Sequence, residues 1–351
     1  MDQSKLQNSV VVHIGLGKTA TTSLQKFIYP MLEKNSSKIV YNCDKFVLKI
    51  ESLHELSYDR TTEVGVFDEL WREWGADNKK YFFSREGLVG HDPHDWERNC
   101  AMVERIFGKD ATIIITVRDP ESYLRSIYQQ MLQEGVVKKP EEFFLKDEIY
   151  LKLCRKFNTG KDIFRVDKFI LQDLIEMYQR TFKRVYVVPM EEINNLKFLA
   201  KIFSLSEAKV EELRSTLKSA PKINKSYSDF AMKLTFKRES FLKKIGLKSF
   251  NNHDNNLNNF IARAYFKDLG AKSSLSMNFL TIEKEKKMQK YFKWNVLMNK
   301  VVNKIFPYKK YCMPEGVLPN QKSNVDYYKI IREKSYKNGY WINDKNKVKK
   351  L

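Results

Sequence analysis

Residues 15 to 23, GLGKTATTS, place two glycines, one lysine and four hydroxyl side chains in nine positions. Glycines let a backbone approach a ligand closely, lysine supplies a full positive charge, and hydroxyls donate hydrogen bonds. Free amides and the dipole at a helix N-terminus also favour an anion. The stretch therefore predicts a site for a phosphate-like anion. The alternative is an ordinary glycine turn with a solvated lysine.

The spacing differs from that of an ATP-type P-loop. Gly-x-x-x-x-Gly-Lys-[Ser/Thr] would require a glycine at position 12, where the chain has Val12. A second segment, IIITVRDPESYLRSIYQQM, is an apolar run that ends in Arg118 and leads into a helical pattern. A kinase or ATPase would be expected to place a magnesium-binding aspartate at such a strand end. Arg118 and Ser126, about two helical turns apart, suit a phosphate monoester instead.

Both residues of this second segment also have structural interpretations. Ser126 could bond back to an upstream carbonyl, and Arg118 could pair with Asp119 or Glu121. We favour the phosphate interpretation because a cation after a strand and at the start of a helix repeats the chemistry of known phosphate sites.

The elements that position these residues follow from hydrophobic patterning. Short β-branched and aromatic runs predict buried strands, and three- and four-residue apolar steps predict helices between them. The strands are expected at residues 9–14, 80–84, 111–117 and 184–190, with a helix over 167–184 and another from Thr22 onward that Pro30 should kink or end. This alternation predicts an α/β fold with a parallel sheet and helices on both faces.

The carboxyl-terminal third has a different composition. After about residue 230 the strand patterns fade, and Lys-rich helical patterns surround the asparagine-rich tract at 251–260. We therefore expect a domain over 1–230 and a basic, mainly helical extension over 231–351, packed on that domain.

In combination, the two segments resemble the motifs of sulfotransferases that use 3′-phosphoadenosine 5′-phosphosulfate (PAPS), in particular the carbohydrate-type enzymes. HIGLGKTATTSLQ is similar to their 5′-phosphosulfate motif, with Gly17 where proline is frequent and Ala20 where glycine is frequent. VRDPESYLRSIY is similar to their 3′-phosphate motif. Residues 185–193 resemble the strand and acidic turn that follow in the family, and NKS at 224–226 resembles a late loop near the nucleotide. The resemblance covers residues 9 to 230.

This resemblance implies sulfuryl transfer from PAPS to a hydroxyl of an acceptor, which we expect to be a carbohydrate or glycolipid. Lys18 would stabilise charge on the oxygen that leaves the sulfonate, and no metal is expected. The implied PAPS-binding residues are Gly15, Gly17, Lys18, Thr19, Ala20, Thr21, Thr22, Ser23, Arg118, Ser126, Asn224 and Ser226.

We expect the general base in the segment that follows the strand at 80–84, because the carboxyl ends of parallel strands share one edge of the sheet. Glu86 is the first choice, with His91 and His94 as reserves and Arg85 as a contact to the sulfonate or acceptor. The alternatives are a surface carboxylate for Glu86 and a metal site at the two histidines. His13 is interpreted as a strand residue beside the loop.

Two other function classes stay open. A P-loop kinase would need an acidic magnesium ligand, and a basic nucleic-acid-binding protein would account for the net charge of +20. Because no nucleic-acid-binding module is recognisable, we expect no specific nucleic-acid partner. Peripheral contact with a membrane stays open. No apolar run approaches the ~20 residues of a membrane span, no signal peptide is evident, and the four scattered cysteines suit a reducing compartment, so we expect a cytoplasmic enzyme.

Overall fold

The structure is a computed structural model that describes residues 10–43, 79–90, 92–133, 137–157, 163–221 and 321–344, with positions 232, 235–237 and 240. The chain divides into two compact units. The first contains Met1–Ile127, Phe144–Lys225 and Gly316–Leu351, and the second contains Tyr128–Phe143 and Ser226–Glu315. Each unit is described by itself.

A six-stranded sheet forms the centre of the first unit, in the order β2-β3-β1-β4-β7-β8. Its strands are β1 (Val10–His13), β2 (Ile39–Tyr41), β3 (Lys80–Ser84), β4 (Thr112–Val117), β7 (Arg184–Pro189) and β8 (Trp341–Asp344). The first five are parallel, and β8 pairs antiparallel with β7. All residues of β1 and β4 are buried, as expected for inner strands that are covered on both faces.

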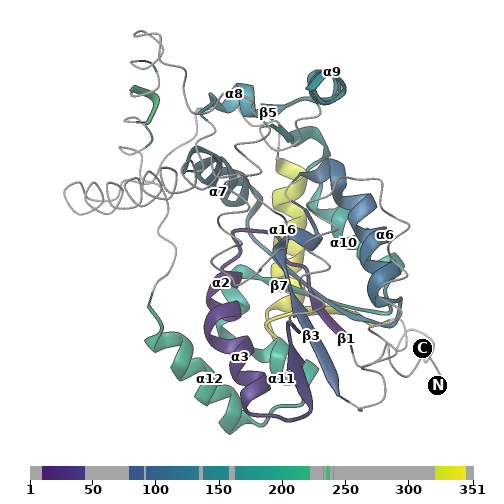
Figure 1. Cartoon of the computed structure of the whole chain (residues 1–351), viewed down its shortest axis with the longest axis vertical. Coiled ribbons are helices and arrows are strands. Elements are labelled where there is room, and N and C mark those ends of the chain that lie inside the picture. Colours follow the sequence, from purple (N-terminus) through teal and green to yellow (C-terminus); the bar gives the residue numbers. More distant parts are fainter. Residues whose placement is uncertain are drawn as a thin grey trace, which may run out of the picture. The chain divides into compact units, whose positions relative to one another are not determined.

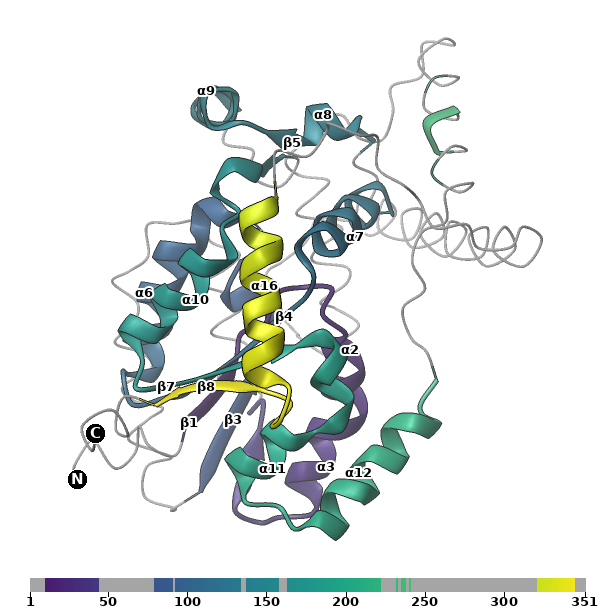
Figure 2. The same ribbon diagram turned by 180° about the vertical axis from the view of Figure 1, so that it is seen from behind.

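Helices cover both faces of this sheet (Figure 1). One face carries the segment formed by α2 (Thr21–Ser23), the π-helical turn Leu24–Ile28 and α3 (Tyr29–Lys34), together with α11 (Lys197–Phe203) and α12 (Glu207–Ser219). The other face carries α6 (Trp96–Phe107), α10 (Leu171–Thr181) and α16 (Lys322–Ser335), which Figure 2 shows from behind. A small parallel pair, β5 (Phe144–Leu145) and β6 (Phe164–Arg165), lies near α9 (Asp147–Phe157).

The chain changes direction across the sheet at β1. The helical segment after β1 lies on one face, whereas α6, which follows the neighbouring strand β3, lies on the other (Figure 1). In open α/β sheets, ligands bind in the crevice at such a switch point, outside the carboxyl ends of the strands. The topology therefore indicates that a ligand site would lie at the loops after β1, β3 and β4.

The second unit includes the part of α7 (Pro120–Gln133) from Tyr128 onward, together with α8 (Pro140–Phe143). Here the Tyr128 hydroxyl donates to the Lys138 carbonyl at 2.7 Å, and its ring lies 5.8 Å from that of Phe143. No helix in the described ranges is both long and apolar enough to cross a membrane.

The α/β class and its mostly parallel sheet are confirmed, and all four predicted strands form. Patterning missed β2 and the two-residue strands β5 and β6, which are too short to show a period. It also missed β8, which lies inside the expected helical extension and joins the main sheet. The expected boundary near residue 230 lies outside the described residues and stays a prediction.

Pro30 neither ends nor interrupts the first helical segment, which continues to Lys34. A π-helical turn, Leu24–Ile28, precedes the proline, and the Tyr29 amide bonds back to the Leu24 carbonyl. This wider turn takes up the irregularity, because the proline has no amide hydrogen and its ring needs space in the preceding turn.

Candidate functional site

The loop after β1, residues 14–20, contains two residues with left-handed backbone angles. Lys18 has a φ of 63° and Ala20 a φ of 64°, whereas Gly15 and Gly17 are not left-handed. Left-handed residues that alternate with other conformations form backbone concavities, called nests, whose amides bind anions. The helical segment over residues 21–34 begins directly after Ala20, so its first amides lie next to the same loop. The backbone of this loop therefore suits an anion.

Gly15 is required by the close approach of β4. A Cβ atom at this position would lie 2.0 Å from the Thr116 hydroxyl oxygen and 2.8 Å from His13 Nε2. The Leu16 amide donates to the Thr116 carbonyl at 3.2 Å. The loop therefore crosses directly over the end of β4, and any larger residue would displace it.

The Thr19 hydroxyl is used inside the protein. It donates to the Leu16 carbonyl at 2.6 Å and lies 2.7 Å from the Thr116 hydroxyl, which must donate to it because the Thr19 proton is already used. The Thr19 side chain is fully buried. A contribution of Thr19 to a ligand would therefore come from its backbone amide.

His13 is a buried structural residue that lies directly below the loop. Its Nε2 lies 3.3 Å from the Thr116 hydroxyl, and its Nδ1 lies 3.0 Å from Ser84 Oγ and 2.9 Å from Tyr29 Oη. Since Thr116 donates to Thr19, we assign the proton of His13 to Nε2, which donates to Thr116. Burial lowers the pKa of His13 to about 3, so the ring stays neutral.

The two predicted motifs meet through Arg118. Its Nη1 donates to the Lys18 carbonyl at 3.1 Å, across 100 positions of sequence. Arg118 comes just after the carboxyl end of β4. This strand pairs with β1, and the loop follows β1. The arginine therefore fixes the shape of the loop backbone at the position of its lysine.

The guanidinium of Arg118 is only partly satisfied by hydrogen bonds. Its Nε is buried and has no hydrogen-bond partner. Burial is the main cause that lowers its pKa, against the opposing charges of Asp119 and Glu191. Asp119 caps the following helix, since its Oδ1 accepts from the Ser122 amide at 2.9 Å. Ser126 is half-buried, and no described residue hydrogen-bonds to its hydroxyl.

The remaining candidates from the loop differ in their burial. Gly17 and Thr21 are buried, Lys18, Thr22 and Ser23 are half-buried, and Ala20 is exposed. Asn224 and Ser226 lie outside the described residues.

The segment after β3 lies beside the loop at its first residue. The Arg85 amide donates to the His13 carbonyl at 2.9 Å, so Arg85, the residue after β3, lies beside the end of β1. Glu86 begins the 3₁₀ turn Glu86–Leu88, and only its backbone is described. His91 lies outside the described residues. Among the candidates for the base, Glu86 is therefore the one next to Arg85, whose amide is hydrogen-bonded to the end of β1.

His94 belongs to a different cluster. Its side chain is exposed, and its Nδ1 lies 3.1 Å from Arg165 Nη1, while Arg165 forms an ion pair with Asp147 at 2.8 Å. The His94 amide donates to Asp92 at 2.8 Å, and burial raises the pKa of this carboxyl to about 7. No contact in the described ranges joins His94 to Lys18 or Arg118. Within those ranges no group of three or more His, Cys, Asp or Glu side chains could hold a metal.

Sequence reasoning missed the part of α16 at this edge of the sheet. The Tyr328 hydroxyl donates to Glu191 Oε2 at 2.6 Å, and Arg332 Nη1 lies 2.8 Å from the same oxygen. Glu191 belongs to the 3₁₀ turn after β7 and lies within electrostatic range of Arg118. No sequence signal could have linked Tyr328 to this turn, because 137 positions separate them.

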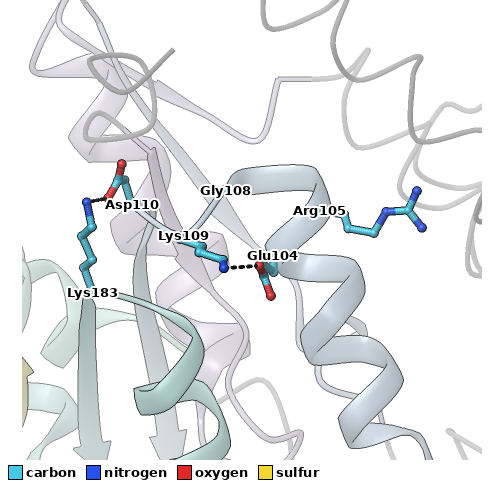
Figure 3. Close-up of a pocket in the computed structure, with 6 residues that line it drawn as sticks. All are labelled: Glu104, Arg105, Gly108, Lys109, Asp110 and Lys183. Carbon is cyan, nitrogen blue, oxygen red and sulfur yellow. Dashed lines mark ion pairs between the residues drawn. The ribbon is translucent and has the colours of Figure 1, made fainter. Parts of the chain in front are cut away.

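A recess elsewhere on the first unit is not the candidate site. It is lined by Glu104, Arg105, Gly108, Lys109, Asp110 and Lys183. Figure 3 shows it at the end of α6, where β4 begins, so it opens at the amino ends of the strands. Lys109 pairs with Glu104 and Lys183 with Asp110. Ligands of parallel sheets bind at the opposite, carboxyl ends, and we place the site there.

No protein-family model, curated protein or solved structure matches this chain.

Proposed function

We propose that the chain is a PAPS-dependent sulfotransferase that transfers a sulfuryl group to a hydroxyl of a carbohydrate or glycolipid. The observation that carries the proposal is the hydrogen bond from Arg118 to the Lys18 carbonyl. It joins a loop suited to a phosphosulfate and an arginine suited to a phosphate monoester at the ends of neighbouring strands. A donor with anionic groups at two positions of one ribose would need two such sites close together.

The proposed chemistry is an in-line displacement at sulfur. The acceptor oxygen forms a bond to sulfur, the bond between sulfur and the 5′-phosphate oxygen breaks, and the acceptor proton passes to a base. Lys18 would stabilise the negative charge that develops on the departing phosphate oxygen. Glu86 is the proposed base, because the amide of the adjacent Arg85 is hydrogen-bonded to the last residue of β1. His91 and His94 remain its reserves.

Two features favour this donor over ATP with magnesium. In a P-loop kinase the hydroxyl after the lysine binds Mg²⁺, whereas here the Thr19 hydroxyl is bound to the Leu16 carbonyl and to Thr116. An acidic residue would also be expected at the end of β4, where this chain has Arg118.

Calorimetric titration with adenosine 3′,5′-bisphosphate tests donor recognition. The chain should bind the bisphosphate, and Lys18→Ala or Arg118→Ala should remove most of the affinity. Lys26→Ala provides the matched control, because Lys26 is an exposed lysine on the adjacent helical turn. Absence of binding to the unaltered chain, or a thermal shift with ATP and Mg²⁺ but none with the bisphosphate, would overturn the proposal.

Transfer itself is measured with labelled PAPS offered to a panel of glycans and glycolipids, with the product mass as the readout. Lys18→Ala should lower the turnover on the order of 10² to 10³-fold, as expected for a lost charge-stabilising donor.

A further inference from the structure

Three neighbouring strands of the sheet place a polar side chain below the loop after β1. His13 pairs with Ser84 of β3 in register, and Thr116 lies two positions beyond Ile114, the partner of His13 in β4. Register partners, and residues two positions apart on a strand, point to the same face of a sheet. The three polar side chains therefore share one face, and all three are buried. Ile114 belongs to the apolar core of that face.

Thr116 is the member of this group that contacts the loop. Its hydroxyl lies 3.3 Å from His13 Nε2 and 2.7 Å from the Thr19 hydroxyl. The Thr19 hydroxyl in turn donates to the Leu16 carbonyl at 2.6 Å. Gly15 leaves the space for the Thr116 hydroxyl, because a Cβ atom at Gly15 would lie 2.0 Å from that oxygen. Side-chain hydrogen bonds therefore tie the loop to β4 from inside the protein.

Thr19, which Thr116 contacts, lies between the two left-handed residues of the loop. Lys18 and Ala20 have φ angles of 63° and 64°, which L-residues rarely adopt unless surrounding contacts hold them there. The Thr19 side chain is fully buried, and Arg118 Nη1 donates to the Lys18 carbonyl at 3.1 Å. β4 and the residue that follows it thus hold two successive residues of the loop.

We propose that Thr116 is a positioning residue for anion binding, because its hydroxyl holds the loop in the conformation in which the loop amides meet the ligand. A preformed site binds more tightly than one that the ligand must first order. The Thr116 side chain is fully buried, so it acts through the loop and not by contact with the ligand. The inference rests on the proposed function for the identity of the anion, and it assigns a role to a residue outside both motifs.

The test removes the Thr116 hydroxyl and then restores it. Thr116→Val keeps the shape of the side chain, and it should weaken adenosine 3′,5′-bisphosphate binding about 5- to 20-fold in calorimetric titration. Thr116→Ser keeps the hydroxyl and loses only the methyl group, so its affinity should stay within about twofold of that of the unaltered chain. Thr112→Val is the matched control, because Thr112 is buried four positions earlier on the same face of β4.

Amide hydrogen exchange of the ligand-free chain gives a second readout. In Thr116→Val the amides of residues 16–20 should exchange faster, whereas the amides of β1 and β4 should keep the rates of the unaltered chain. Thr116→Ser should restore slow exchange in the loop. Thr19→Val breaks the same contact from the loop side and should have similar effects. It keeps the test decisive if Thr116→Val does not fold.

The outcomes separate this inference from the proposed function. If both valine variants bind the bisphosphate as tightly as the unaltered chain, the inference is wrong and the proposed function stands. Equal losses in Thr116→Ser and Thr116→Val would also overturn the inference, because the hydroxyl would then not be the group that acts. If the unaltered chain does not bind the bisphosphate, the proposed function is wrong. Unchanged loop exchange in the valine variants would then overturn the inference as well, and faster exchange that Thr116→Ser reverses would support it.

Discussion

At the scale of single residues, the loop after β1 places its strain on residues other than its glycines. Lys18 and Ala20 adopt left-handed angles, which cost an L-residue about 1 kcal/mol each. Gly15 serves a different purpose, since it makes room for Thr116. The loop therefore keeps a strained backbone at the place where its amides would meet an anion, as is frequent at functional sites.

Ala20→Gly should relieve part of this strain. We expect the free energy of unfolding to rise by up to about 1 kcal/mol, because glycine adopts a positive φ without a steric penalty. Urea denaturation measures the change. Ala101→Gly is the control, since Ala101 is exposed within α6 and its replacement should lower the free energy of unfolding by about 0.5–1 kcal/mol. Equal destabilisation by both variants would contradict the strain at Ala20.

At the scale of elements, α16 and β8 attach the end of the described chain to the sheet. β8 covers the edge of β7, whose unpaired backbone groups would otherwise be open to another strand. α16 packs on the same face as α10, and its Asn324 accepts from the Leu171 amide at 2.8 Å. Through Tyr328 and Arg332 it also holds Glu191 near Arg118. The candidate site thus depends on a segment that the sequence motifs do not include.

Tyr328→Phe should loosen this attachment. The variant removes a hydrogen bond to a carboxylate, and we expect the free energy of unfolding to fall by about 1.5–3 kcal/mol. Hydrogen exchange of amides in α16 should also become faster. Tyr327→Phe is the matched control, because no described residue hydrogen-bonds to the half-buried Tyr327 hydroxyl. A Tyr328→Phe variant as stable as Tyr327→Phe would show that the contact contributes nothing.

At the scale of the whole molecule, two buried groups give stability opposite dependences on pH. The pKa of His13 falls from 6.5 to about 3, so between these values the unfolded chain binds a proton that the folded chain excludes. Acidification therefore disfavours folding in that range. The pKa of Asp92 rises from 3.8 to about 7, so acidification between these values favours folding. The two effects partly cancel between pH 4 and 6.5.

Replacement of His13 should reveal the cancellation. Between pH 7.5 and pH 5.0, the unaltered chain should lose about 2 kcal/mol more free energy of unfolding than His13→Gln does. Because the change with pH is measured within each protein, the pH-independent cost of the substitution does not affect the result. Asp92 is present in both proteins, so its contribution is the same in each. Between pH 7.5 and 9.0 the two proteins should change equally. Identical pH profiles from 7.5 to 5.0 would contradict the buried neutral histidine.

The sequence by itself was sufficient for features that depend on neighbouring residues. β-branched runs predicted the inner parallel strands, and the residues of GLGKTATTS predicted a loop between a strand and a helix. The expectation that Arg118 and the lysine loop share one edge of the sheet rested on the rule that parallel strands align their carboxyl ends. Their contact at the Lys18 carbonyl agrees with it. The roles assigned to Lys18, Glu86 and Arg118 stay predictions.

Tertiary structure alone decided the features that depend on distant segments. It shows that the Thr19 hydroxyl binds inside the loop, that both ring nitrogens of His13 have hydroxyl partners and that His94 contacts Arg165. It also brought β8 to the sheet edge and buried the Nε atom of Arg118 without a hydrogen-bond partner. Hydrogen-bond partners and burial depend on which side chains the folded chain brings together, and local sequence patterns do not specify contacts between segments a hundred or more residues apart.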